Sequence, residues 1–143
     1  MDVKTTFING VIEEEVYIQQ PEYFEIFDIE SHVCWLMREL YRLKQAPRAW
    51  YTRIDSYLNR LGFTKSEADA NLYQIVVDGK IPIIVIYVDD LILTSDEQLI
   101  NSCKEDLARE FEMMDMGLLH YFLGLEIWQQ DGEKFVSQSK YAK

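Results

Sequence analysis

The stretch from Ile83 to Thr94 constrains the fold of this chain most, because two adjacent carboxylates interrupt an otherwise apolar run. The run is rich in β-branched residues, which are stiff at χ1 and favour strands over helices. It predicts two buried strands with Asp89 and Asp90 at the bend between them. Turn chemistry explains an acidic pair at a bend, although like-charge repulsion makes Asp-Asp a poorer turn than Asp-Gly. A metal site explains the pair equally well, and this stretch alone leaves both interpretations open.

The size and composition of the chain predict one folded domain. Its 143 residues are enough for one core and too few for two. No segment reaches the apolar length that crosses a bilayer, and residues 1–10 lack the pattern of a signal peptide. We therefore expect a soluble intracellular protein with no membrane partner and no targeting signal. The isolated Cys34 and Cys103 predict buried thiols rather than a disulfide or a zinc site.

The charge of the chain is distributed unevenly. A net charge of −11 argues against a protein whose whole surface binds nucleic acid. The segment from Arg38 to Lys65 nevertheless contains seven basic and two acidic residues. Four aromatic residues lie among them, as on a surface that holds a phosphate backbone and stacks bases: Tyr41, Trp50, Tyr51 and Tyr57. A solvated helix face with Arg stems lying along it explains the same composition equally well.

The first half of the chain predicts three short strands and a helix. Residues 1–10 form the end of a strand and close on an Asn-Gly turn signal. Val16–Ile18 and His32–Met37 predict two further strands, the first within an acidic tract. Pro47 suits a first helical position and Gly62 a left-handed stop, so a helix lies between them. The polar face of this helix presents Arg48, Arg53 and Arg60.

The second half predicts two hairpins separated by a second helix. Residues 72–88 form a hairpin around the Asp78–Gly79 turn and lead into the Asp89–Asp90 bend. Ser95–Gln98 has the capping-box arrangement, which begins a helix that ends near Met113. Residues 118–137 predict the second hairpin.

This order predicts an α+β fold with a ferredoxin-like β-α-β-β-α-β antiparallel sheet and both helices on one face. The first strand then lies beside the central hairpin, with the strand from Leu118 as the last of the sheet. Asp2 therefore comes close to Asp89 and Asp90. Three carboxylates at one sheet edge repel one another, and divalent cations are their usual neutralisers.

Five segments follow one another in the order found in a known polymerase family. Residues 1–10, 40–51 and 87–90 resemble polymerase motifs A, B and C, and residues 121–127 and 135–143 resemble the primer-grip hairpin and the segment beyond it. Over nearly its whole length the chain thus resembles the reverse transcriptase of copia-type retrotransposon Pol polyproteins. Five motifs in one order make this resemblance far more specific than a Tyr-Val-Asp-Asp alone.

The resemblance implies a polymerase palm with part of the fingers, which adds deoxynucleotides to the 3′ end of a primer. Its partners would be an RNA or DNA template with primer, deoxynucleoside triphosphates and the remainder of the Pol polyprotein. Two Mg²⁺ or Mn²⁺ ions would serve as cofactors, one lowering the pKa of the primer hydroxyl and one stabilising the leaving pyrophosphate. The implied compartment is a cytoplasmic particle or the nucleus.

The resemblance also implies a role for individual residues. By this resemblance the catalytic carboxylates would be Asp2, Asp89 and Asp90, which would bind the metal ions with help from the Val3 carbonyl. The nucleotide-binding residues would be Lys4, Thr5, Thr6, Phe7, Lys44 and Gln45. Phe7 would block a ribose 2′-hydroxyl, while an ordinary core Phe is the alternative. The primer grip would use Leu123 and Gly124, and further nucleic-acid contacts would come from Arg48, Trp50 and Tyr87.

Two residues depart from the pattern of the family. Arg42 replaces a glycine of motif B, and Met114 replaces a lysine that could assist pyrophosphate departure; either change is expected to reduce activity. We expect residues 1–143 to be a single partial domain, without the N-terminal fingers, thumb and ribonuclease H. The alternatives are a catalytically inactive relic that acts as a binding module, and a ferredoxin-like module unrelated to polymerases.

Overall fold

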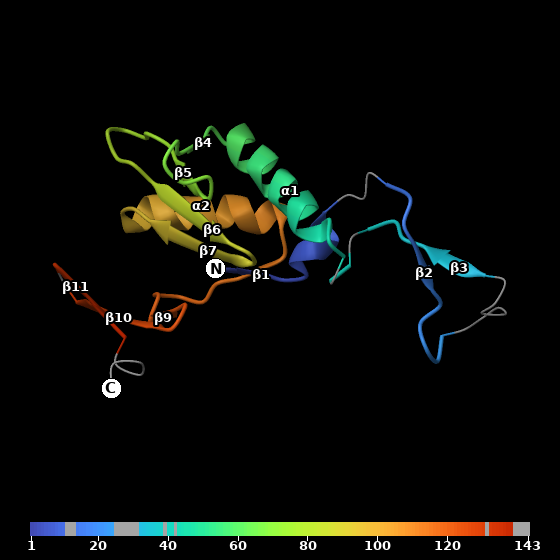
Figure 1. The fold of residues 1–143 in the computed structure, drawn as a ribbon. Coiled ribbons are helices and arrows are strands. Elements are labelled where there is room, and N and C mark those ends of the chain that lie inside the picture. The colour runs from blue at the N-terminus through green and yellow to red at the C-terminus, as the bar shows by residue number, and fades with distance from the viewer. Residues whose placement is uncertain (11–13, 25–31, 39, 42, 131, 139–143) are drawn as a thin grey trace.

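The computed structural model describes residues 1–10, 14–24, 32–38, 40–41, 43–130 and 132–138 (Figure 1). These residues form an α+β fold with two α-helices, one 3-10 helix and mostly short antiparallel strands. In chain order the elements are β1 (Asp2–Val3), η1 (Thr6–Asn9), β2 (Tyr17–Gln19), β3 (Val33–Trp35), α1 (Ala46–Arg60), β4 (Thr64–Lys65), β5 (Leu72–Gln74), β6 (Ile83–Tyr87), β7 (Asp90–Thr94), α2 (Glu97–Glu110), β8 (Met113–Met114), β9 (Tyr121–Phe122), β10 (Leu125–Gln130) and β11 (Glu133–Ser137).

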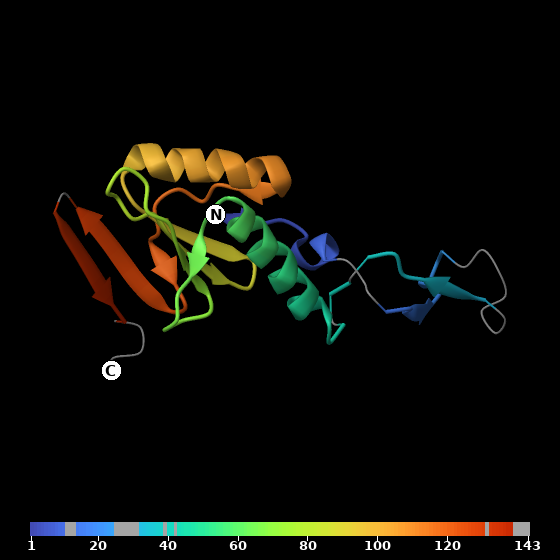
Figure 2. The same ribbon diagram turned by 90° about the horizontal axis from the view of Figure 1, so that it is seen from above.

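The described strands form three sheets. The main sheet has six strands in the order β4-β5-β6-β7-β1-β8, and all its described pairings are antiparallel. The order β11-β10-β9 makes a second sheet, and β2 pairs with β3 in a separate hairpin. Figures 1 and 2 place the β2–β3 hairpin at one end of the molecule and the β9–β11 sheet at the other. The main sheet and both helices lie between them.

Both helices pack with the main sheet in one core. Side chains that alternate along the strands, among them Ile84, Ile86 and Leu91, are buried on one sheet face. On α1 the buried positions recur at three- and four-residue spacing, and α2 adds Leu107 to the same cluster. The buried face of α1 consists of Ala46, Trp50, Ile54, Tyr57 and Leu58.

The predicted bounds of α1 are confirmed. Pro47 lies in its first turn, where the missing N–H removes no helical hydrogen bond. Gly62 follows the helix with φ 92°, the left-handed conformation that glycine adopts without strain. The strands predicted around Val16–Ile18 and within His32–Met37 are also present, as β2 and β3.

The second helix begins one residue later and ends earlier than predicted. Its N-cap is Asp96 rather than Ser95, with the Asp96 carboxylate accepting a hydrogen bond from the Leu99 amide at 3.1 Å. Phe111 leaves the helix with extended backbone at φ −124° and ψ 146°. Its ring makes edge contacts with the rings of Trp50 and Tyr57, at centroid distances of 5.3 and 5.2 Å. The helix therefore ends before Met113, and the Phe111 ring is part of the core although its backbone is extended.

The early helix end corrects the predicted last strand of the sheet. Met113–Met114, and not the segment from Leu118, pairs with β1 as β8. The strands β9, β10 and β11 instead form a separate sheet. A two-residue strand carries no periodicity in the sequence, so neither β8 nor β4 was predicted. Cys34 and Cys103, predicted as buried, are free thiols that are both partly exposed.

Candidate functional site

The turn between β6 and β7 consists of Val88 and Asp89. Tyr87 and Asp90 are the last residues paired across the two strands, so Asp90 already belongs to β7. The predicted bend at Asp89–Asp90 is therefore wrong by one residue. The core fixes this register, because a shift by one position would turn the buried Ile86 and Leu91 away from the helices.

Strand β1 brings Asp2 beside this turn. Asp2 lies directly opposite Asp90 in the antiparallel ladder. The backbone nitrogen of Met1 and the amide of Leu91 each donate to the carbonyl of the other residue, both at 2.8 Å. The Val3 amide donates to the Asp89 carbonyl at 2.9 Å, which fixes β1 against the turn itself. The carboxylate of Asp2, distant in sequence, thus joins the adjacent Asp89 and Asp90 at one edge of the hairpin.

Asp2 and Asp90 lie on the sheet face that points away from the helices. Their neighbours along the strands, Val3 and Leu91, are each only 1% exposed in the core, and successive strand residues point to opposite faces. Directly opposed residues of an antiparallel ladder share a face. The pairings therefore produce a row across the sheet in the order Tyr87, Asp90, Asp2, Met114.

Negatively charged carboxylates lie close together in and beside this row. Burial raises the pKa of the Asp90 carboxyl, and the neighbouring charges of Asp89 and Asp2 raise it further. Carboxylates and a main-chain carbonyl are the hard oxygen donors that suit Mg²⁺ or Mn²⁺. In chemical type the donor set fits a divalent cation. Within the described ranges, however, no three His, Cys, Asp or Glu side chains meet at one point that would hold a metal ion.

The predicted nucleotide-binding residues after β1 differ in their exposure and in their contacts. Thr6 is fully buried, and its Oγ1 donates to the Val3 carbonyl at 2.6 Å, so its hydroxyl holds the strand end. Thr5 is exposed with φ 51°, at the start of η1. The Lys4 ammonium lies 3.0 Å from the Glu112 carboxylate in an exposed ion pair. Phe7 makes an edge contact with the Tyr41 ring at 4.8 Å.

The residues around the start of α1 lie in different environments. Lys44 and Arg48 are exposed, and Gln45 is partly exposed at the helix N-cap. Trp50, predicted to contact nucleic acid, is 2% exposed and packs in the core. Its indole Nε1–H donates to the Val88 carbonyl at 2.8 Å. Arg42 lies outside the described residues, so its place relative to the site is not described.

Much of the basic segment is engaged within the protein. Arg53 and Arg60 of α1 both form ion pairs with Glu110 of α2, and the Lys65 ammonium lies 2.7 Å from the Asp55 carboxylate. The Arg53 guanidinium also lies over the Phe111 ring. These contacts favour the interpretation of this helix face as a structural one. The exposed cations nearest the start of α1 remain as candidates for phosphate contact.

The predicted primer-grip turn lies close to the acidic hairpin. Leu123 and Gly124, with φ 50° and 81°, connect β9 to β10, and both adopt the left-handed conformation of a two-residue turn. The Phe122 ring contacts the Tyr87 ring edge-on at 5.5 Å. The contact joins the second sheet to the row that contains Asp90. Phe122 was not among the predicted site residues, and a lone aromatic beside a turn gave no signal of this role.

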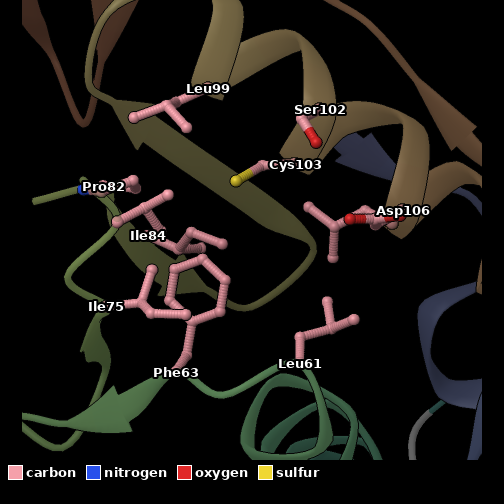
Figure 3. A pocket seen from close by; sticks show the side chains of 11 residues that line it. Leu61, Phe63, Ile75, Pro82, Ile84, Leu99, Ser102, Cys103 and Asp106 are labelled. Atoms are coloured by element: carbon pink, nitrogen blue, oxygen red, sulfur yellow. The ribbon is translucent and has the colours of Figure 1, made fainter. Parts of the chain in front are cut away.

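A pocket of about 180 Å³ lies on the other side of the sheet, between α2, β6 and the residues after α1 (Figure 3). Its lining is mostly apolar, with the thiol of Cys103 among the side chains that surround it. Burial raises the pKa of this thiol, and the charge of Asp106 adds to the effect. The pocket contains none of the predicted site residues.

Comparison with known proteins gives a consistent result. A family model described as reverse transcriptase (RNA-dependent DNA polymerase) matches residues 1–143. The retrovirus-related Pol polyprotein from transposon TNT 1-94 of Nicotiana tabacum is 39% identical over 145 residues, covering 99% of this chain and 11% of that protein. The corresponding polyprotein from transposon RE1 of Arabidopsis thaliana is 37% identical over 142 residues, covering 99% of this chain and 10% of that protein.

A shorter relative, the putative transposon Ty5-1 protein of Saccharomyces cerevisiae, is 35% identical over 144 residues, covering 99% of this chain and 46% of that protein. The chain spans about a tenth of the two plant polyproteins. No solved structure gives a significant match. Among the described residues, no helix is long and apolar enough to cross a membrane.

Proposed function

Because the chain belongs to the reverse transcriptase (RNA-dependent DNA polymerase) family, we propose that it forms the palm of an RNA-directed DNA polymerase with part of the fingers. It would add deoxynucleotides to the 3′ end of a primer on an RNA or DNA template. The observation that carries this proposal is the register of Asp2 opposite Asp90, with Asp89 on the adjoining turn. The strand order β8-β1-β7-β6, with α1 and α2 packed in one core, supports a ferredoxin-like palm.

Asp2, Asp89 and Asp90, with the Val3 carbonyl, would hold two Mg²⁺ or Mn²⁺ ions. When bound, such ions lower the pKa of the primer hydroxyl and stabilise the charge of the departing pyrophosphate. The raised pKa of Asp90, caused first by burial and then by the charges of Asp89 and Asp2, supports this assignment, because a bound cation would offset that repulsion. Thr6 contributes by holding the Val3 carbonyl from within the core.

The substrates would approach the exposed side of this row. Lys4, Thr5, Lys44 and Gln45 would contact the nucleotide or template, and Phe7, held against Tyr41, would bar a ribose 2′-hydroxyl. On the other flank, the Leu123–Gly124 turn would hold the primer end, since Phe122 places it beside Tyr87. The exposed Tyr87 and Arg48 would make further nucleic-acid contacts. Trp50, being buried, is not assigned such a contact.

The activity is proposed for the chain as part of a longer Pol polyprotein, whose remaining domains would hold the template and primer. We place it inside the cell, in a cytoplasmic particle or the nucleus. The test is to replace the aligned region of the tobacco polyprotein with residues 1–143 of this chain and to measure Mg²⁺-dependent primer extension on RNA. We expect extension that Asp89→Asn abolishes. Asp78→Asn, in the exposed turn of the preceding hairpin, is the matched control and should leave extension unchanged.

The contrary outcome is equally specific. Absence of extension in the exchanged polyprotein, even after Arg42→Gly and Met114→Lys restore the family residues, would refute the polymerase assignment. It would support instead an inactive relic whose folded domain acts by binding alone. A polyprotein that regains extension with both replacements would identify these two departures as the cause of the loss.

A further inference from the structure

The two carbonyls of the Val88–Asp89 turn are each held from outside the hairpin. The Val88 carbonyl accepts a hydrogen bond from the Trp50 indole of α1 at 2.8 Å. The Asp89 carbonyl accepts one from the Val3 amide of β1 at 2.9 Å. Two elements that lie far apart in sequence therefore fix the backbone that carries Asp89.

The turn needs external support because of its first residue. Val88 has φ 55°, in the left-handed region. A β-branched residue is a true outlier there and keeps the conformation only where its surroundings impose it. The side chain of Val88 is 51% exposed, so its own packing does little to hold it.

Trp50 is placed to impose this conformation. Its side chain is 2% exposed, and its ring packs edge-on against Phe111 at 5.3 Å. The indole N–H is a donor with no acceptor function, so in the core its orientation is fixed by the single carbonyl that it meets. The packed helix α1 is thereby bonded directly to the turn.

We propose that Trp50 is a positioning residue, which acts through the Val88 carbonyl to hold the turn that presents Asp89 beside Asp90 and Asp2. Its consequence for catalysis rests on the proposed function, whereas its effect on the turn does not. From the sequence, Trp50 is expected to contact nucleic acid. In the structure its indole instead supports the acidic turn.

The first test is Trp50→Phe, which retains a buried ring against Phe111 and removes the N–H donor. Amide hydrogen exchange should accelerate about two- to tenfold, as expected for the loss of one hydrogen bond, at Val3, whose N–H donates to the Asp89 carbonyl, and at Leu91, whose N–H joins β7 to the Met1 carbonyl. Titration with Mn²⁺ should show the dissociation constant rising by a similar factor. Trp128→Phe is the matched control, because Trp128 is 67% exposed, and it should change neither quantity.

A rescue separates positioning from general damage to the core. Glycine adopts φ 55° without strain, so Val88→Gly in the Trp50→Phe background should restore both slow exchange and Mn²⁺ affinity. Val88→Gly in the otherwise wild-type chain is the control, because relief of strain alone would slow exchange by the same factor in both backgrounds, whereas a positioning role of Trp50 predicts a larger gain in the Trp50→Phe background. Unchanged exchange in Trp50→Phe, or failure of the second substitution to restore it, would overturn the positioning role.

The two proposals fail in distinguishable ways. The metal site of the proposed function is refuted if the wild-type chain does not bind Mn²⁺, or if it binds Mn²⁺ and Asp89→Asn leaves that binding unchanged. The exchange rates at Val3 and Leu91 still decide the role of Trp50, because they report the turn without any cation. Faster exchange in Trp50→Phe, reversed by Val88→Gly, supports positioning in either case.

Discussion

Replacing Asp90 by Asn should stabilise the folded chain when divalent cations are absent. Asp90 and Asp2 lie directly opposite each other in the ladder, which brings their Cβ atoms to roughly 5 Å. Two unit charges at that distance repel by about 0.8 kcal/mol in water and by about 3 kcal/mol in a medium of dielectric constant 20. Both residues are partly exposed, so a gain of about 1 kcal/mol in the free energy of unfolding is expected for Asp90→Asn.

The pH dependence of this gain has a definite sign. The folded chain raises the pKa of Asp90, so the folded state binds the proton more tightly than the unfolded state does. The wild-type chain therefore loses stability as pH rises from the unfolded pKa of about 4 through the raised folded pKa, and the loss is complete above it. Asp90→Asn lacks this loss, so its advantage should be absent in strong acid and full at neutral pH.

The assay is urea unfolding followed by circular dichroism, first with a chelator and then with increasing Mn²⁺. A cation that binds only the folded wild-type chain adds about 2.7 kcal/mol at a hundred times its dissociation constant. Because Asp90→Asn should bind Mn²⁺ weakly, the order of stability should reverse as Mn²⁺ is added. Asp78→Asn removes an exposed turn carboxylate elsewhere and should behave as the wild-type chain does in both conditions.

Two results would refute this reasoning. The first is an Asp90→Asn variant that is less stable than the wild-type chain in chelator at neutral pH, since the carboxylate would then be making a favourable contact. The second is equal stabilisation of both chains by Mn²⁺, which would place the cation away from this row.

Three further predictions follow from the geometry. Gly62→Ala should lower the free energy of unfolding, measured by urea titration, by about 1–2 kcal/mol. The reason is that Gly62 has φ 92° and an added Cβ would lie 3.2 Å from Ile75 Cδ1. An unchanged free energy of unfolding would contradict the left-handed helix stop. Alkylation of Cys103 by iodoacetamide, followed by mass spectrometry, should be slower at neutral pH than that of a thiol in a short peptide, because burial raises its pKa and lowers the thiolate fraction; equal rates would contradict this environment. Met114→Lys should raise the free energy of unfolding in chelator by roughly 0.5 kcal/mol, because position 114 lies opposite Asp2 on the same face; the gain should vanish in Asp2→Asn.

Local signals in the sequence predicted the elements that local chemistry determines. Pro47 and Gly62 delimit α1 because a missing N–H and a free φ act within one turn of the helix. The Asp78–Gly79 turn is present for the same reason, with φ of 50° and 76° at its two residues. Neither boundary depends on what the rest of the chain contacts.

The errors arose where distant contacts override local pattern. Phe111 follows Leu107 at helical spacing, so the sequence predicts a longer helix, yet its backbone is extended and its ring lies against Trp50 in the core. The turn at Val88 has no local signal, because nothing in a valine favours φ 55°. Its position follows from the register that buries the strand side chains, and register is a property of two segments together.

The residues of the polymerase-like motifs also differ in whether local pattern or distant contacts determine their role. Thr6 and Trp50 both have side chains that bind nucleotides or bases in other settings, and both are buried here with their polar atoms on main-chain carbonyls. Those carbonyls belong to Val3 and Val88, which adjoin Asp2 and Asp89 in the chain. The spacing of a motif predicts that a residue lies near the acidic row, but it does not predict whether the side chain points into the core or to the solvent. Burial decides that question, and it separates the groups that could meet a substrate from those that hold the acids in place.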